Sequence, residues 1–238
     1  MVPMEGGTGM GASISSLLKS PGSILYELTS GTRAGGVAVS LWVITVAGLL
    51  VFGAVTGSIS GGVQWWAAPA KIAGGVLFAS LICLPSLYIF AALSGMALRL
   101  NAITGILLST TGLTALLLAG FTPLVWVFGQ STGSISFMGG IILVIWLFSL
   151  LFGMNLLIKC SRALGMTDGL HLWIWCFMFL LVTLQVSCAL RPIIGTADTL
   201  LPKEKKFFLR HWADTLNEET GNRRTASASA AATGNAGD

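Results

Sequence analysis

Charged residues are scarce in this chain of 238 residues, where they make up only 9% of the sequence. Soluble domains average about 25% charged residues, so the composition excludes an ordinary soluble protein. Of the 13 lysines and arginines and the 9 aspartates and glutamates, only five lie between residues 37 and 190: Lys71, Arg99, Lys159, Arg162 and Asp168. The remaining charges are confined to the two ends of the chain, which we therefore expect to face water.

Residues that build catalytic or metal centres are also few. The chain has four cysteines and two histidines, His171 and His211, and it contains no CxxC pair. It has no HExxH motif, no Walker phosphate-binding loop and no pair of aspartates inside a hydrophobic run. We therefore predict a protein without enzymatic activity, cofactor or metal site, and we interpret the cysteines as small apolar side chains.

Long hydrophobic runs dominate what remains, since 54% of the residues are hydrophobic. A helix rises about 1.5 Å per residue, so about 20 apolar residues cross a hydrocarbon core of about 30 Å. Five runs reach that length: Val37–Ser58, Lys71–Arg99, Ala102–Gly129, Phe137–Ile158 and Leu170–Leu190. The sequence predicts an all-α polytopic membrane protein, with a bundle of about five transmembrane helices in residues 35–196.

Both ends of the chain are predicted to add interfacial amphipathic helices to this bundle. Apolar residues at helical spacing in residues 13–34, broken at Pro21, indicate two short helices on the membrane surface, with a loosely ordered leader as the alternative. Residues 197–220 place basic and apolar side chains on opposite faces, which indicates another interfacial helix. Residues 1–12 and 221–238 are expected to be disordered.

The run Lys71–Arg99 is longer than a straight span requires, because 29 helical residues would reach about 43 Å. We expect it to tilt and to bend at Pro85, whose ring nitrogen cannot donate to the carbonyl of Leu81. The hydroxyl of Ser80 or Ser86 is predicted to bond to that carbonyl instead. Pro85 is then either a fixed kink that improves packing or a moving hinge in a pore.

Small residues recur at four-residue spacing, as in Gly53 with Gly57 and Gly75 with Ala79. Such faces allow helices to approach closely, so we predict close packing within the chain first and oligomerisation second. Polar side chains inside the runs are few and uncharged. Asn155 and Gln185 are predicted to form hydrogen bonds across helices within the bundle, with contact to a substrate as the alternative.

Two further local features lie in the third and fifth runs. Pro123 interrupts the third run near its end, and the same run carries a face of threonines. Asp168 and His171 stand at the start of the fifth run, where a carboxylate is favoured by the helix dipole. We predict that Asp168 caps this helix.

Basic residues indicate an orientation. With five spans, the side that holds the N-terminus carries Lys19, Arg33, Arg99, Lys159 and Arg162. First segments and short loops usually decide topology, so we predict a cytoplasmic N-terminus, although the basic tail from Arg191 onward favours the opposite orientation. Basic flanks of this kind contact anionic lipid, so we expect membrane lipid, and not nucleic acid, as a partner.

The order of these parts resembles a known family. A leader with SPGSILYEL precedes the runs, the second run contains ICLPSLY (residues 82–88), and the last ends in LRPIIG (residues 190–195). Over residues 14–196 the chain is similar to bacterial five-span membrane proteins grouped with the Yip (Ypt/Rab-interacting protein) family. The resemblance implies a cytoplasmic N-terminus and a role in membrane assemblies, and it implies no catalytic or ligand residues. Residues 203–216 depart from the pattern.

The sequence thus favours a non-enzymatic integral membrane protein of the bacterial plasma (inner) membrane. We expect it to act as a scaffold or accessory subunit, with a second copy or another membrane protein as partner. The alternative is a small transporter or channel for a neutral or apolar solute. The candidate structural residues are Pro85, Pro123, Gly53, Gly57, Gly75, Asn155, Gln185 and Arg191.

Overall fold

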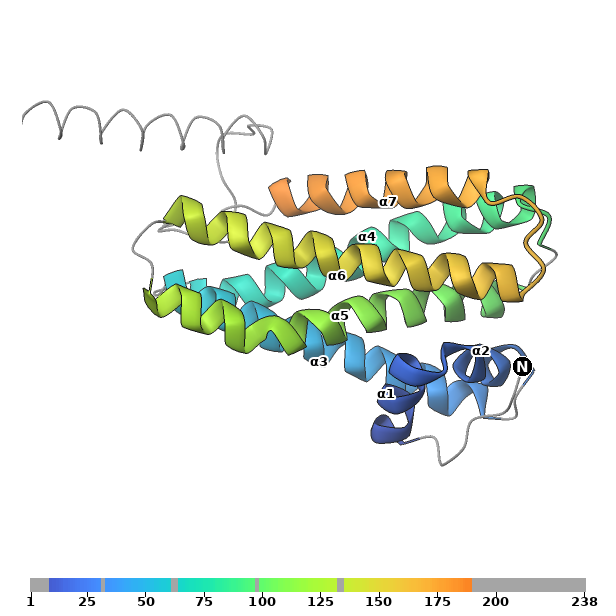
Figure 1. The fold of residues 1–238 in the computed structure, drawn as a ribbon, viewed down its shortest axis with the longest axis horizontal. Helices are drawn as coiled ribbons and strands as arrows, with labels where there is room; N and C mark the ends of the chain where they lie inside the picture. The colour runs from blue at the N-terminus through green and yellow to red at the C-terminus, as the bar shows by residue number, and fades with distance from the viewer. Residues whose placement is uncertain (1–8, 31–32, 61–63, 97–98, 132–134, 190–238) are drawn as a thin grey trace, which may run out of the picture.

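A computed structural model describes residues 9–30, 33–60, 64–96, 99–131 and 135–189 of the chain. These residues form seven α-helices and no strand: α1 Met10–Lys19, α2 Pro21–Ser30, α3 Ala34–Ser60, α4 Gln64–Leu93, α5 Leu100–Ser131, α6 Ile135–Ala163 and α7 Leu170–Ala189. Helices α3 to α7 lie roughly side by side, and the short α1 and α2 cover one side of this bundle near one end (Figure 1). The all-α prediction is confirmed.

Helices α3 to α6 are each long and apolar enough to cross a membrane. Helix α7 is apolar as well, over the shorter segment Leu170–Val186. The helical membrane architecture is therefore confirmed, whereas the count of five spans stays a prediction. The predicted interfacial helix in residues 197–220, the tail 221–238 and Arg191 all lie outside the described residues.

The second predicted span is wrong at both ends, because α4 runs from Gln64 to Leu93 and not from Lys71 to Arg99. Trp65 and Trp66 lie in its first turn, six and five residues before the predicted start at Lys71. Its far end is set by Gly95, which has a φ of 85° and lets the amide of Met96 donate to the Ala91 carbonyl at 3.2 Å. A residue with positive φ ends a helix in this way, and glycine takes that conformation without strain.

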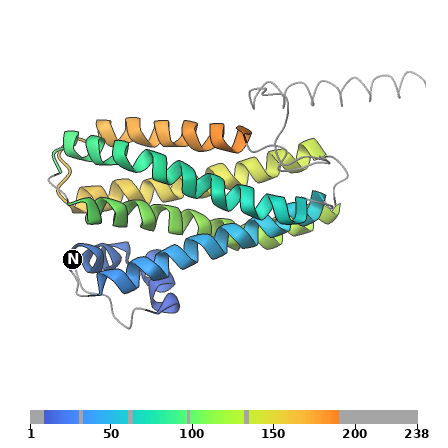
Figure 2. The same ribbon diagram turned by 180° about the vertical axis from the view of Figure 1, so that it is seen from behind.

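Helix α5 lies at the centre of the bundle and is the most buried of the four long helices. Helix α3 packs against both α4 and α5, α6 packs against α5, and α7 packs mainly against α4 (Figure 2). The buried apolar side chains form two clusters along the bundle. Only the cluster nearer α1 and α2 includes residues of α7.

Glycines bring several of these helices into backbone contact. A Cβ atom added to Gly53 would lie 2.5 Å from the Cα of Pro69, so α3 and α4 cannot tolerate a larger residue there without moving. The same atom added to Gly153 of α6 would lie 2.9 Å from the carbonyl oxygen of Thr110 on α5. Close packing of this kind is the role that the sequence indicated for Gly53. Gly57 and Gly75 are also buried.

The two short helices predicted between residues 13 and 34 are present as α1 and α2, and α2 begins at Pro21 as expected. Helix α1 already starts at Met10, inside the leader that the sequence indicates as disordered. Leu17 of α1 reaches the bundle, where its Cδ2 would lie 3.8 Å from a Cβ atom on Gly112 of α5.

Candidate functional site

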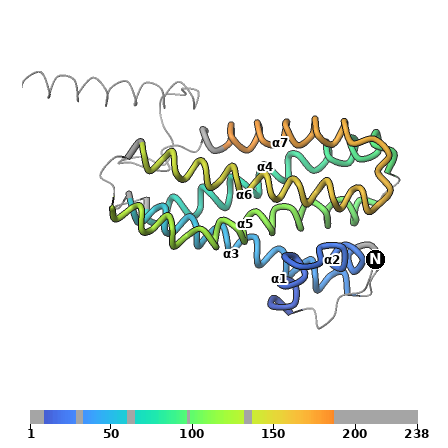
Figure 3. Tube along the Cα trace, in the orientation of Figure 1, coloured from blue at the N-terminus to red at the C-terminus, as the bar shows by residue number. Residues whose placement is uncertain are grey.

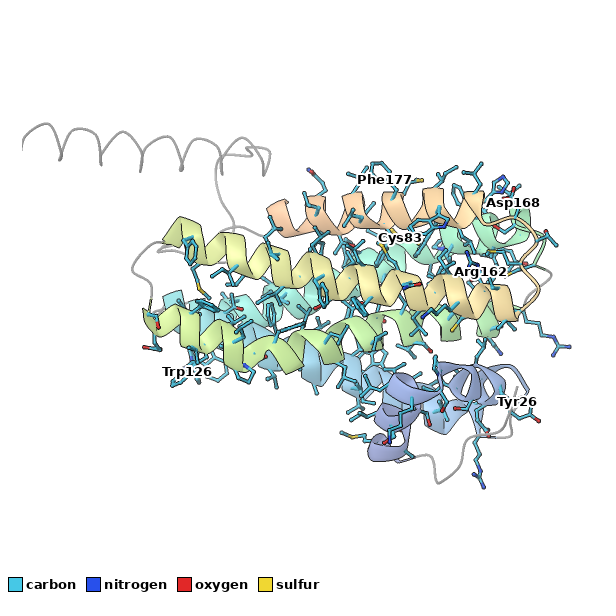
Figure 4. The ribbon with its side chains drawn as sticks, viewed as in Figure 1. Tyr26, Cys83, Trp126, Arg162, Asp168 and Phe177 are labelled. Carbon is cyan, nitrogen blue, oxygen red and sulfur yellow. The ribbon has the colours of Figure 1, made fainter. Side chains whose placement is uncertain are left out.

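The contact between α4 and α7 is the most specific in the bundle, because a side chain of α7 donates hydrogen bonds to α4. Trp175 is almost fully buried, and its indole Nε1 donates to Ser86 Oγ at 3.0 Å and to the Cys83 carbonyl at 3.3 Å. Its ring stacks on Phe179 with centroids 5.1 Å apart. Figure 4 shows Cys83 between these two helices. Trp175 therefore fixes α7 against the turn of α4 that contains Pro85.

The predicted partner of the Leu81 carbonyl is wrong. Ser80 Oγ donates to the Val76 carbonyl at 2.8 Å, and Ser86 Oγ donates to the Cys83 carbonyl at 2.8 Å. Both hydroxyls reach back along the helix to the carbonyl three or four residues earlier, which is their usual geometry in helices. Pro85 itself is exposed, and α4 continues through it to Leu93.

A second attachment joins the α4–α5 and α6–α7 connections, which lie at the same end of the bundle (Figure 3). The amide and the hydroxyl of Thr167 both donate to the carbonyl of Ser94, each at 3.1 Å. Gly95 lies so close to the Thr167 hydroxyl that a Cβ atom would collide with it. Helix α7 is therefore tied to α4 twice, along its length through Trp175 and at its start through Thr167.

Asp168 Oδ1 accepts the amide of Leu170, the first residue of α7, at 2.9 Å, so Asp168 helps to cap the helix as predicted. The N-cap position itself belongs to Gly169, whose carbonyl accepts the amide of Trp173 at 3.1 Å. Asp168 Oδ2 lies 3.4 Å from Nδ1 of His171, within ion-pair distance, yet Nδ1 has no hydrogen-bond partner of acceptable geometry. The contact is therefore an ion pair without a hydrogen bond, and it exists only when His171 carries a charge. The two side chains stabilise the start of α7, which is a structural role.

The side of α7 that faces away from α4 is exposed. Residues 172, 175, 176, 179 and 183 are buried, so helical periodicity turns the intervening positions outward. We call these positions the outer face of α7: Trp173, Ile174, Phe177, Met178, Leu181 and Gln185. Figure 4 shows Phe177 pointing away from the bundle.

The predicted hydrogen bonds of Asn155 and Gln185 across helices inside the bundle are wrong, because both side chains are exposed. Gln185 belongs to the outer face of α7. Asn155 lies on the outer side of α6, in line with the exposed Lys159 and Arg162. A polar residue in a hydrophobic run is expected to be buried, but the rotation of each helix against its neighbours decides which way that residue points.

The threonine face of α5 is buried in helix contacts. Thr110, Thr111 and Thr114 donate to the carbonyls four residues earlier at 2.9, 3.0 and 2.9 Å. Thr110 and Thr114 also adjoin Gly153 of α6. The hydrogen-bond donors of this face are therefore used within α5.

Exposed tryptophan and tyrosine side chains form two belts, whereas exposed phenylalanines such as Phe78 lie between them. Trp42, Tyr88 and Trp173 are exposed towards the end that carries the α4–α5 and α6–α7 connections, which we call the loop end. The exposed tryptophans towards the other end are Trp65, Trp66 and Trp126. On α4, Trp66 and Tyr88 are 22 residues apart, so the belts are about 33 Å apart for a straight helix. That separation matches a hydrocarbon core of about 30 Å between two interfaces.

In the described part of the chain, the exposed cations gather near the loop end: Lys19, Arg33, Arg99, Lys159 and Arg162. Figure 4 shows Arg162 and Asp168 at this end, opposite Trp126. Lys71 lies at the opposite end, where it is buried in α4 five residues after Trp66. Among the described residues, no group of three or more histidine, cysteine or acidic side chains is placed to hold a metal ion. Cys83, Cys160 and Cys176 are buried free thiols, as predicted.

No protein-family model, curated protein or solved structure matches this chain. The resemblance to the Yip family therefore stays a prediction that rests on two short segments. The first, Ile82–Tyr88, is the turn of α4 that Trp175 contacts, and the second, residues 190–195, lies outside the described residues.

The predicted site residues do not form one cluster. Pro85 lies eight residues from the end of α4, and Pro123 lies eight residues from the opposite end of α5. Because α4 and α5 meet at the loop end, these prolines are separated by about 22 Å along the bundle. Sequence reasoning missed Trp175, although its spacing with Leu172 and Phe179 is that of one buried helical face.

Proposed function

We propose that this integral membrane protein is a non-enzymatic scaffold or accessory subunit of a membrane assembly. The observation that carries the proposal is the position of α7. Its buried side is fixed to α4 by Trp175 and Thr167, while its opposite side carries large exposed side chains and one polar side chain. A rigidly held edge helix with a free outer face is suited to contact another membrane protein.

Of the features that favour a transporter, the threonine face of α5 is used in packing, whereas Pro85 and Pro123 are exposed. The threonines of α5 donate to their own helix and adjoin Gly153 of α6. Pro85 and Pro123 are about 22 Å apart along the bundle, too far to act as one gate. These observations support the scaffold over the transporter.

We propose a plasma-membrane location with the loop end on the cytoplasmic side. The support is that all five exposed cations of the described residues lie near that end, which the positive-inside rule favours on the cytoplasmic side. Helices α1 and α2 adjoin the same end, so they would lie in the cytoplasmic interface, and the Yip-like resemblance implies the same orientation. With five spans, the C-terminus lies on the opposite side.

Reporter fusions after Asp238 test this topology. We expect a phosphatase that is active only outside the cytoplasm to give a strong signal there, and a fluorescent protein that folds only in the cytoplasm to give none. The reverse pattern would overturn either the orientation or the count of five spans. A second fusion between α1–α2 and α3, near Arg33, separates these two explanations.

Assembly is tested by extraction into lipid nanodiscs and native mass spectrometry of the intact particles. We expect a homo-oligomer or a stoichiometric complex with another membrane protein. A monomer without a partner, at the concentration found in the membrane, would overturn the scaffold proposal. Solute flux in reconstituted liposomes, absent from empty liposomes, would favour the transport alternative instead.

A further inference from the structure

Gln185 lies at a depth where an exposed amide is costly. It is 12 residues beyond Trp173, the belt residue of α7, and therefore about 18 Å further into the membrane along the helix. In a hydrocarbon core of about 30 Å, that position is close to the middle. Polar side chains at such depth usually face the bundle or a partner, because lipid chains offer no hydrogen bonds.

Gln185 has no such partner within the chain as described. Its side chain is exposed on the outer face of α7, and no hydrogen bond joins it to another described residue. The helix phase explains the direction, since Trp175 and Phe179 hold the opposite side of α7 against α4. Rotating α7 to bury Gln185 would break both hydrogen bonds of the Trp175 indole.

The neighbours of Gln185 form a continuous surface. Ile174, Phe177, Met178 and Leu181 are exposed on the same face, at spacings of three or four residues. Among the described helices, α7 packs closely against α4 and contacts α6 only slightly, so no described helix lies along this face. A helix from outside the chain can therefore lie along it.

We propose that the outer face of α7 is a homodimer interface in which Gln185 of one copy forms hydrogen bonds with Gln185 of the other. An amide side chain carries both a donor and an acceptor, so it is complementary to itself across a two-fold axis. A second copy presents the same amide at the same depth in the membrane. A helix of an unrelated protein would carry a matching polar side chain at that depth only by chance. The inference rests on the scaffold proposal and identifies the partner and the surface.

Dimerisation can be measured with the full chain in liposomes, by energy transfer between fluorophores at the N-terminus, as the protein-to-lipid ratio is varied. We expect Gln185→Leu to weaken the dimer by about 3-fold to 20-fold, the range that interhelical hydrogen bonds in membranes give. Gln185→Asn keeps the amide and should restore part of the loss.

Asn155→Leu is the matched control, because Asn155 is also an exposed amide but lies beside Lys159 on α6. It should leave the dimer unchanged. Thermal denaturation of each variant establishes that the bundle still folds.

A dimer that Gln185→Leu leaves unchanged, or that Asn155→Leu weakens equally, would overturn this interface while the scaffold proposal stands. A complex with a different membrane protein that depends on Gln185 would also overturn the homodimer interface while leaving the scaffold proposal intact. A wild-type monomer without any partner would overturn both proposals.

Discussion

Replacing Trp175 by phenylalanine tests how much the indole of Trp175 contributes to holding α7 against α4. The substitution keeps an aromatic ring against Phe179 but removes the indole N–H that donates to Ser86 Oγ and the Cys83 carbonyl. The Ser86 hydroxyl still donates to the Cys83 carbonyl at 2.8 Å, so the loss strands no buried donor in α4.

The expected loss of stability in Trp175→Phe follows from these contacts. One interhelical hydrogen bond in a membrane contributes about 0.6 to 1.7 kcal/mol, and the smaller ring leaves a partly filled space that adds to the cost. We therefore expect Trp175→Phe to lower the free energy of unfolding by about 1 to 2 kcal/mol. Ser86→Ala removes the other member of the pair, and the two substitutions should be coupled by about 0.5 to 1.5 kcal/mol in a double-mutant cycle.

Reversible unfolding in mixed detergent micelles, followed by circular dichroism, measures these differences. The matched control is Trp173→Phe, because Trp173 lies two residues away on the outer face of α7 and is 59% exposed. It should change stability by less than about 0.5 kcal/mol. Equal effects of the two tryptophan substitutions, or a coupling of zero between Trp175 and Ser86, would refute the attachment of α7 through its indole.

Three further substitutions test the helix contacts. Gly153→Ala should destabilise the protein by about 1 to 3 kcal/mol in the same assay, because the added Cβ lies 2.9 Å from the Thr110 carbonyl, whereas Gly140→Ala has open space and should not. Gly95→Ala should loosen the Thr167 contact and speed hydrogen exchange at the start of α7, since Gly95 has a φ of 85°. Asp168→Ala removes the carboxylate that accepts the Leu170 amide and should lower the free energy of unfolding by about 1 kcal/mol. Asp168→Asn keeps an acceptor and should change it very little, so equal losses in the two variants would contradict the capping role.

Predictions from the sequence were confirmed where the structure depends only on residues that are close together in the chain. Pro21 begins α2 because its fixed φ suits the first helical turn, and Asp168 caps α7 because its partner is two residues away. The predicted ends of α4 were wrong, since Trp65 and Trp66 fit a first helical turn as well as a loop, and Pro69 lies inside the helix, where proline is usually disfavoured. The local sequence also did not predict that the side chains of Asn155 and Gln185 point outward, because their direction depends on how each helix is rotated against its neighbours.

By itself, the sequence determined that this is a helical membrane protein, because an uncharged run of about 20 residues has no other stable form in lipid. It also determined where prolines and capping residues bound some helices. Only the tertiary structure decided that Trp175 is an attachment and not an interface anchor, and that Gln185 faces outward. Helical periodicity defines which residues share a face, but the packing of α7 on α4 decides which face is buried.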